Sequence, residues 1–486
     1  MVMRAKILDE PKLDFGHGGS HEDPRRGIAD YGPVDLGAPR APTRIRVGLV
    51  GPAEGISGAR AWLERCRTPI EAKPNNRHPR LFQSFPGFDT DRTFRSELVF
   101  DDTWMRAIAN RKIGRILTKP VDLATAECVD LYHREIADLK EKDVVDVIIV
   151  ARPDELQDDI PRTKQAGASK VESSTELSPT HVDFHDLLKA YSLVWRIPLQ
   201  VMRSTTWDPT RQTAKSQSRR SSSLQDEATR AWNLHTALYY KAGGVPWRMR
   251  RQSADLDSLY VGVSFFHSTD RAEVHTSVAQ VFDERGEGVV VRGGPAARKK
   301  SDRQPHLRRA DAEDLLGTAL DAYKREHLHF PARVVIHKTS DFDDEEVSGF
   351  EAAADQRHIY HLELLWIVGA SEGTRLFRNG DHPVLRGTFA TIAARRHILY
   401  TRGSVDQYRV YPGMYIPTPL GIRPAVTERS VEELAGEILT LSKMNWNQSQ
   451  LDGRFPITLS ASKKVARILK NVPDDYPASN RYAMYM

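Results

Sequence analysis

Four polar residues in the middle of the chain have types and spacings that suit the binding of an anion. They are His185, Lys189, Gln200 and Lys241. A helix would place His185 and Lys189 on one face, because they are four positions apart. Lysine supplies a compact positive charge, and histidine and glutamine supply directional hydrogen bonds. From these residues alone, a chance pair of surface side chains is the simpler interpretation of His185 and Lys189.

A second place for phosphate chemistry is the glycine-rich segment Gly51 to Gly58, which follows the apolar run Arg44 to Gly51. A strand, a glycine-rich turn and a helix can together bind phosphate at the helix N-terminus. The segment has no Lys-Ser/Thr after the glycines and does not follow the pattern GxGxxG, so neither common nucleotide motif is present. These glycines therefore favour a structural turn.

Two segments are locally basic. One runs from Arg211 to Arg220, and the other from Arg292 to Arg309, which has seven basic residues against the single acidic residue Asp302. Basic residues that contact a nucleic-acid backbone displace counterions, and this favours binding. Solvated loops explain both segments equally well, and the formal net charge of +5 for the whole chain decides nothing.

The composition is that of an ordinary soluble globular protein, with 40% hydrophobic and 28% charged residues. At about 150 residues per domain, 486 residues allow roughly three domains. No run approaches the ~18 to 20 apolar residues of a membrane span, and the start of the chain has no apolar signal region. Cys66 and Cys128 form no CxxC pair, which predicts reduced thiols in a cytoplasmic protein.

Three parts of the chain differ in pattern. Residues 1–43 are rich in glycine and proline without a helical period, which predicts an extended arm. In the next part, apolar runs predict buried strands, with helices beginning near residues 59 and 184. These strand segments are 44–51, 143–152 and 197–202. This order favours a doubly wound α/β domain.

From about residue 241 the pattern changes to strands that alternate with fewer helices. A strand is predicted over 258–267, and the segments 278–282 and 289–292 flank a turn-forming sequence, which predicts a hairpin. Leu315, Leu316, Ala319, Leu320 and Tyr323 have helical spacing, and a further strand follows at 333–337. This order is compatible with a ribonuclease-H-like fold.

At this point the chain resembles the Argonaute family. His185-x-x-x-Lys189, Gln200 and Lys241-x-Gly-Gly-Val-Pro-Trp are similar to the motif of the MID domain that holds the 5′-phosphate of a guide strand. Other segments resemble signatures of the PIWI domain; these are Tyr260 to Ser264, Val335 to Thr339, Tyr411 to Pro419, Lys443 to Asn447 and Phe455 to Leu459. The run Ile7 to Gly16 and the length resemble short prokaryotic Argonautes. The resemblance implies an α/β fold in three parts: an arm over 1–43, a doubly wound MID domain over 44–240 and a ribonuclease-H-like PIWI domain over 241–486.

The resemblance assigns His185, Lys189, Gln200 and Lys241 to the guide 5′-phosphate. A further lysine that is common in the family falls here at Ala237, so one contact is missing. The resemblance also implies a structural Mg²⁺ beside that phosphate, held by Gln200 and by the terminal carboxylate of Met486. A cation between two anions relieves their repulsion. This requires the end of the chain to turn inward, whereas chain ends usually fray.

The resemblance also implies that the chain does not cut nucleic acid. Slicing relatives hold two metal ions with carboxylates, and the matching positions here are Ser264 and Thr339, whose neutral hydroxyls are poor ligands for Mg²⁺. The acidic run Asp341 to Glu346 is expected to form the first turn of the next helix, where acidic residues are favoured. Glu284 and Glu287 lie where slicing relatives place a mobile glutamate, but alone they would not build a metal site.

The partners follow from the resemblance as well. They are a guide RNA, a single-stranded DNA target, and a protein with an APAZ region fused to an effector such as a TIR domain, a SIR2 domain or a nuclease. The chain is then the sensor subunit of a heterodimeric immune system, and Arg402, Arg423, Lys299 and Lys300 are candidates for contact with the nucleic-acid backbone. Two alternatives remain open. One is an active guided endonuclease that uses Asp341 to Glu346, and the other is an enzyme of nucleotide metabolism that uses Gly51 to Gly58.

Overall fold

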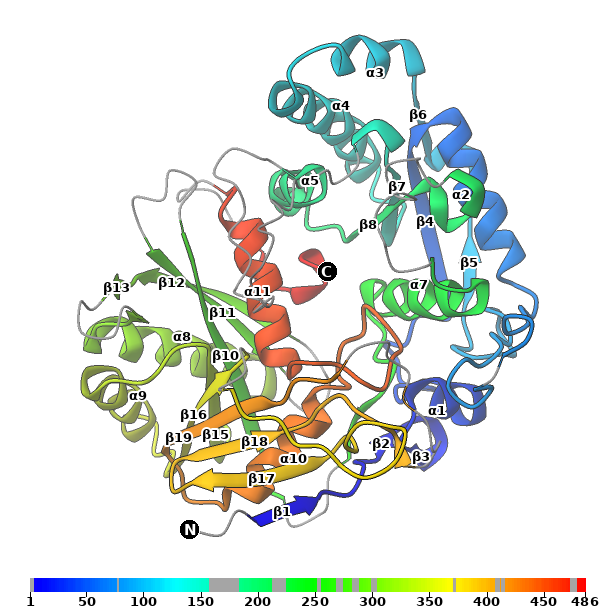
Figure 1. Cartoon of the computed structure of the whole chain (residues 1–486). Helices are drawn as coiled ribbons and strands as arrows, with labels where there is room; N and C mark the ends of the chain where they lie inside the picture. Colours follow the sequence, from blue (N-terminus) through cyan, green and yellow to red (C-terminus); the bar gives the residue numbers. More distant parts are fainter. Residues whose placement is uncertain are drawn as a thin grey trace.

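The computed structural model shows two β-sheets joined by a shared layer of helices (Figure 1). It describes residues 4–486 without the following segments: 77, 157–182, 212–223, 251–254, 268–273, 282–287, 299–303, 370–372, 407–410, 412–415 and 473–478. Besides the two main sheets there are a three-stranded sheet and a short pair of strands, β13 (Ala297–Arg298) and β14 (Pro305–His306).

The smaller main sheet is parallel and has helices on both faces. Its order is β5-β4-β7-β8, and β6 pairs with the second half of β4. The strands are β4 (Arg44–Pro52), β5 (Glu97–Val99), β6 (Met105–Ile108), β7 (Val147–Ala151) and β8 (Leu199–Met202). Side chains of Val47 and Leu49 pack with α2 (Ala53–Arg65), whereas Ile148 and Val150 pack with α4 (Val121–Glu141) and α5 (Phe184–Ser192). The short helix α3 (Asn110–Leu117) precedes α4. The predicted doubly wound arrangement is therefore observed in this sheet.

The glycines at the end of β4 and in α2 are explained by close packing. Gly51 has φ +154°, and a Cβ there would lie 2.6 Å from the carbonyl oxygen of Ala151. A Cβ on Gly58 would lie 2.2 Å from the indole nitrogen of Trp207. Helix α2 begins at Ala53, earlier than the predicted residue 59, and Glu54 in its first turn pairs with Arg211. A carboxylate at this helix start disfavours phosphate.

The larger sheet has nine strands in the order β1-β17-β18-β19-β16-β15-β10-β11-β12. Strand β10 (Ser258–His267) runs parallel to β15 (Arg333–Lys338) and antiparallel to β11 (Val274–Val281), which forms the predicted hairpin with β12 (Val289–Pro295). Most of the predicted turn, with Glu284 and Glu287, lies outside the described residues. The remaining strands are β1 (Arg4–Ile7), β16 (His361–Val368), β17 (Thr388–Ala393), β18 (Arg396–Leu399) and β19 (Leu420–Val426).

Helices cover both faces of the larger sheet. Val261 and Val263 of β10 pack with α8 (Arg309–His327) and α9 (Asp344–Asp355). Tyr260 and Val335 belong instead to the core that contains α10 (Val431–Leu441) and α11 (Ile457–Leu469). Neighbouring residues of a strand point to opposite faces, so one apolar run supplies both layers. The predicted helix around Leu315 to Tyr323 is α8, which extends further at both ends.

The N-terminal arm is not wholly extended, so that prediction is partly wrong. Residues Pro24–Tyr31 form helix α1, which begins with a proline at its first position and with the Asp23 side chain accepting from the backbone N–H of Arg25. These two local signals start a short helix without a long apolar period. The rest of the arm contains β2 (Leu13–Asp14), β3 (Ser20–His21) and β1; β2 pairs with β9 (Arg248–Met249) and β1 with β17.

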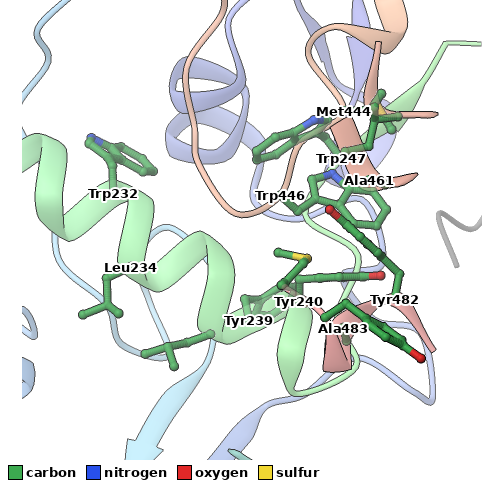
Figure 2. Close-up of a cluster of buried hydrophobic side chains, with 14 of the residues drawn as sticks. Trp232, Leu234, Tyr239, Tyr240, Trp247, Met444, Trp446, Ala461, Tyr482 and Ala483 are labelled. Atoms are coloured by element: carbon green, nitrogen blue, oxygen red, sulfur yellow. The ribbon is translucent and has the colours of Figure 1, made fainter. Parts of the chain in front are cut away.

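The two main sheets share one hydrophobic core, and α7 (Glu227–Lys241) lies at its centre (Figure 2). In this core the rings of Tyr240 and Trp446 have centroids 4.7 Å apart, and the indole of Trp247 donates to the carbonyl oxygen of Lys443 at 3.1 Å. Tyr482 and Ala483 pack in the same cluster. The ends of α5, α7 and α11 are thereby brought together. The division of the chain at residues 43/44 and 240/241 stays a prediction.

The structure also bears on the two cysteines and on membrane-spanning helices. Both Cys66 and Cys128 are free and buried, and burial raises the pKa of the Cys128 thiol to about 11. Among the described residues, none of the helices is both long enough and apolar enough to cross a membrane.

Candidate functional site

The four residues singled out from the sequence lie on three elements that meet at one place. His185 and Lys189 are on α5, Gln200 is on β8, and Lys241 is the last residue of α7. Helix α5 begins there because the Asp183 side chain accepts hydrogen bonds from the backbone of His185 and Asp186. Lys241 Nζ donates to Gln200 Oε1 at 2.5 Å. The tertiary structure therefore joins residues 41 positions apart in sequence.

A buried lysine without a partner is the most unusual feature of this place. Lys189 is 1% exposed, and its Nζ has no hydrogen-bond partner among the residues that the structure describes. Burial and the neighbouring charge of Lys464 lower the pKa of Lys189 to about 7. Burial, Lys189 and Lys464 also hold the pKa of Lys241 well below its usual value. Buried donors are normally satisfied, so an orphaned ammonium indicates a site that is completed by an anion.

Lys464 is a third lysine of this pocket, and sequence reasoning missed it. It lies on α11, and burial followed by the charge of Arg467 lowers its pKa to about 8. No Asp or Glu side chain of the described residues pairs with Lys189, Lys241 or Lys464. Three mutually repelling cations are costly without an anion to offset them. The sequence signal was weak, because Lys463 and Lys464 together look like ordinary helix surface.

His185 stands at the rim of the lysine pocket, defined here by Lys189, Lys241, Lys464 and Gln200. Its Nδ1 lies 2.9 Å from Asp186 Oδ1, and its side chain is 36% exposed. Desolvation and nearby cations outweigh Asp186 and lower the pKa of His185 to about 4, so the ring is neutral. Asp186 in turn lies 2.9 Å from the Arg467 guanidinium. The carboxylate of Asp186 thus contacts His185 and Arg467 and pairs with none of the three lysines.

The end of the chain is turned inward. Residues Tyr482 to Met486 are buried, and Met486 is 4% exposed. In Figure 1 the C-terminus lies between α5, α7 and α11. Tyr485 donates its hydroxyl to the carbonyl oxygen of Ser479 at 2.7 Å, which fixes this last turn. Ala237, which the resemblance matches to a further lysine, is buried on α7 at 2% exposure and adds no charge.

The donor set of the lysine pocket fits an anion better than a bare metal ion. Gln200 Oε1, the side-chain oxygen expected to hold Mg²⁺, already accepts from Lys241. A separate group, Asp183, His185 and Asp186, has ligand atoms that lie within 4.8 Å of one another. Its carboxylates are engaged by the start of α5 and by Arg467. The role of Met486 as a metal ligand stays a prediction.

Ser264 and Thr339, which the resemblance matches to catalytic carboxylates, lie close together, Thr339 directly after β15. Ser264 is on β10, and the backbone N–H of Thr339 donates to the carbonyl oxygen of Val263 at 3.2 Å. Ser264 is 2% exposed, and no described residue forms a hydrogen bond with its hydroxyl. The carbonyl oxygen of Thr339 accepts from the indole of Trp366 at 3.2 Å.

The acidic run after Thr339 is part of the structure of α9. Asp343 and Glu346 form a reciprocal capping box at its start, as the helix-start interpretation predicts. Lys338 Nζ lies 2.5 Å from Glu346 Oε2, and His306 Nδ1 lies 3.0 Å from the same oxygen. His306, Asp343 and Glu346 also have the spacing of a metal group. Lys338 Nζ also donates to the carbonyl oxygen of Asp341 at 2.6 Å, so its charge is offset within this group.

The candidates for backbone contact are already used in the fold or lie outside the described residues. Arg402 Nε donates to the carbonyl oxygen of Asp452 at 2.9 Å. Arg423 stacks on Trp366, with its guanidinium carbon 4.2 Å from the ring centroid. Lys299 and Lys300 lie outside the described residues, and Arg211 pairs with Glu54 and Asp154. Roles for Arg402, Arg423, Lys299 and Lys300 in nucleic-acid binding remain predictions.

Comparison with known proteins gives the fold a name. No protein-family model matches the chain. A protein argonaute of Aquifex aeolicus is 23% identical over 239 residues, which is 49% of this chain and 31% of that protein. Among solved structures, Clostridium butyricum Argonaute bound to a guide DNA and a 19-mer target DNA matches with a TM-score of 0.64 and 15% identity.

Two further structures agree. Drosophila Piwi matches with a TM-score of 0.62 and 14% identity, and Aquifex aeolicus Argonaute with externally bound siRNA matches with 0.59 and 15%. Each match covers 99% of this chain, but only 54% of the Clostridium protein and 56% of the other two. The chain therefore has the Argonaute fold over its whole length and spans about half the length of these structures.

Proposed function

We propose, on the premise that this chain has the Argonaute fold, that it binds a guide strand by the strand's 5′-phosphate. The observation that carries this proposal is the lysine pocket: three cations, at least one of them wholly buried and unpaired, converge with Gln200 at the meeting point of α5, α7 and α11. A dianionic phosphate offsets their charge and satisfies the orphaned donor of Lys189. His185, at the rim, would offer a further hydrogen bond to the same phosphate.

A structural Mg²⁺ is the second part of the proposal. When bound, the ion supplies positive charge between the phosphate and the carboxylate of Met486. The inward turn of the last residues supports this arrangement. Because Gln200 already accepts from Lys241, the ion would depend on the phosphate for most of its ligands, and the lysines alone are expected to retain part of the affinity.

We further propose that the chain does not cut its target. Ser264 and Thr339 are neutral, and Ser264 is buried, so neither offers the anionic oxygens that two Mg²⁺ ions require. The nearest acidic run is committed to capping α9 and to pairing with Lys338 and His306. These contacts speak against the alternative of an active guided endonuclease, and the packing of Gly51 and Gly58 speaks against a nucleotide-metabolising enzyme.

The biological role proposed is that of a sensor. A guide RNA paired with single-stranded invader DNA would switch on an effector carried by a separate APAZ protein, as in the short prokaryotic Argonautes that the sequence resembles. Such switching requires that target binding favours the active assembly over the inactive one. The run Ile7 to Gly16 carries the resemblance on which this role rests. The effector chemistry then belongs to the partner, in an immune heterodimer.

A binding and cleavage experiment tests the proposal. The protein, purified with its APAZ partner carrying an inactivated effector, is titrated with labelled RNA guides that carry a 5′-phosphate or a 5′-hydroxyl. Complementary DNA and Mg²⁺ are then added. The expected result is strong preference for the 5′-phosphate and an intact target. Equal affinity for both guides would mean that the lysine pocket does not bind the 5′-phosphate. Cleavage of the target at one fixed phosphate would contradict the proposal that this chain does not cut.

A further inference from the structure

The carboxyl ends of three strands of the larger sheet lie at one edge. Strands β10, β15 and β16 run parallel to one another. Ser264 is near the end of β10, Thr339 directly follows β15, and Gly369 directly follows β16. The two hydroxyl residues are those that the resemblance matches to catalytic carboxylates, and neither carries a charge.

The start of α11 lies across these strand ends (Figure 1). A Cβ on Gly262 would lie 2.1 Å from the carbonyl oxygen of Thr458, and the hydroxyl of Thr458 lies 2.9 Å from His337 Nδ1. Ser264 is two residues after Gly262, and Thr339 is two residues after His337. Because residues two apart in a strand share a face, α11 covers the face of the sheet on which these positions lie.

Two cations stand on one aromatic ring beside this edge. The ring of Phe455 packs on the backbone of Gly369, where a Cβ would lie 2.6 Å from its tip. The ammonium of Lys463 lies 4.0 Å from the centroid of this ring, and the guanidinium carbon of Arg454 lies 5.2 Å from it. Arg454 Nη2 also donates to the carbonyl oxygen of Gly369 at 2.6 Å. Both cations are therefore positioned at the end of β16.

The charge of Lys463 is not balanced by an acidic neighbour. In the described part of the chain, no Asp or Glu side chain pairs with it. The protein packed around its stem, followed by the charge of Arg454, lowers the pKa of Lys463 to about 8, while part of its side chain stays exposed. Two like charges on one ring repel each other, and an anion that contacts both relieves this repulsion.

We infer that this edge holds one phosphodiester group of the paired target strand, with Lys463 and Arg454 supplying the positive charge that carboxylate-bound metal ions supply in a slicing centre. This inference rests on the proposed function, since it requires a bound guide and a target. The point charge of lysine and the planar fork of arginine both suit phosphate oxygens. An ammonium or guanidinium group holds the backbone but does not generate a metal-bound hydroxide, so the target is retained and not cut.

The phosphodiester site is distinct from the lysine pocket. Lys464 faces Lys189 and Lys241, whereas the neighbouring Lys463 faces Phe455. Successive residues of a helix point about 100° apart, so α11 presents one lysine to each site. Capture of the target and recognition of the guide 5′-phosphate can therefore be measured and altered separately.

The test neutralises one phosphate of the target at a time. The full chain with its APAZ partner, which carries an inactivated effector, is loaded with a 5′-phosphorylated RNA guide. Complementary DNA targets then carry a single uncharged methylphosphonate at successive positions. We expect one position at which this replacement weakens target capture by about tenfold, as loss of a charge-assisted contact does.

The variant Lys463→Met assigns that position to this site. It should weaken capture of the unmodified target by about tenfold and reduce the slope of log affinity against log salt by about one. The methylphosphonate at the sensitive position should then have little further effect, because its charge partner is already absent. Lys463→Arg keeps the charge and should restore the sensitivity to that methylphosphonate.

Lys324→Met is the matched control. Lys324 is an exposed lysine of α8, on the other face of the sheet, and its ammonium lies 4.5 Å from the centroid of Phe330. This variant should capture targets as the unchanged protein does. Three results would overturn the inference: no sensitive position in the target, the same sensitivity in Lys463→Met, or sensitivity confined to phosphates of the guide. Preference for a 5′-phosphate is measured on each preparation, so failure of the proposed function is seen separately.

Discussion

Lys241 Nζ donates to Gln200 Oε1 at 2.5 Å, and this bond joins the end of α7 to β8. It fixes one cation of the lysine pocket before any ligand arrives. Lys189 beside it has no such partner. A pocket with one positioned cation and one orphaned cation is pre-organised for an anion, because the protein has already met the cost of bringing like charges together.

Replacement of Lys189 by methionine should stabilise the empty protein and weaken guide binding. The buried, unpaired amine costs free energy in the empty protein. Lys189→Met should therefore raise the free energy of unfolding by about 1 to 3 kcal/mol. The same change should weaken binding of a 5′-phosphorylated guide by about 10- to 100-fold, as loss of a charge-assisted contact does. Urea denaturation and guide titration measure the two effects, with Lys112→Met as the exposed control. Unchanged guide affinity would contradict the assignment of Lys189.

Guide binding should depend on pH in a defined direction. In the empty protein the pKa of Lys189 is lowered to about 7, whereas an unfolded lysine has its ordinary pKa near 10.4. Between these values the unfolded chain holds a proton that the folded chain lacks, so stability of the empty protein rises with pH in this window. A bound phosphate restores the proton to the folded chain, and binding then requires proton uptake above pH 7.

The affinity for a 5′-phosphorylated guide should accordingly fall by up to about tenfold per pH unit above pH 7 for each lysine involved. Fluorescence anisotropy between pH 7 and pH 9 measures this, and a 5′-hydroxyl guide supplies the control, since its affinity should be nearly flat. Lys189→Met should reduce the dependence of this affinity on pH. Equal pH slopes for the two guides would place the titrating groups elsewhere.

Lys464 should matter for guide binding, and its neighbour Lys463 should matter less for the 5′-phosphate. Lys464 faces Lys189 and Lys241, whereas the ammonium of Lys463 lies over the ring of Phe455 at 4.0 Å. Lys464→Met should reduce the preference for a 5′-phosphate by about tenfold, and Lys463→Met should leave that preference intact. The ratio of the two guide affinities is the measurement. A larger effect of Lys463→Met than of Lys464→Met would mean that α11 is rotated about its axis, so that Lys463 faces the pocket.

Glu346 should behave as a structural residue. It is 0% exposed and pairs with the equally buried Lys338. Glu346→Gln leaves a buried ammonium without its charge partner and should lower the free energy of unfolding by about 3 to 5 kcal/mol. Glu345→Gln, an exposed change in the same first turn, should have little effect. If Glu346→Gln instead left stability unchanged and abolished a Mg²⁺-dependent cleavage, the endonuclease alternative would be restored.

Much of the local structure was determined by the sequence. The apolar runs that became β4, β7, β10 and β15 contain buried residues on both faces, and such runs need no knowledge of the fold to be recognised. The capping of α9 by its acidic residues was predictable for the same reason, since a capping box is satisfied within one turn. The exception was α1, whose two starting signals were outweighed by the glycines and prolines around it.

Only the tertiary structure decided the chemistry of the site. Sequence similarity pointed to His185, Lys189, Gln200 and Lys241, but their burial, the bond between Lys241 and Gln200 and the orphaned Lys189 depend on the meeting of α5, β8 and α7. Lys464 enters from α11, more than two hundred positions after Lys241, and nothing in its local sequence marks it. Charge and spacing are local properties of a chain, whereas desolvation and the convergence of cations are set by distant elements packing together.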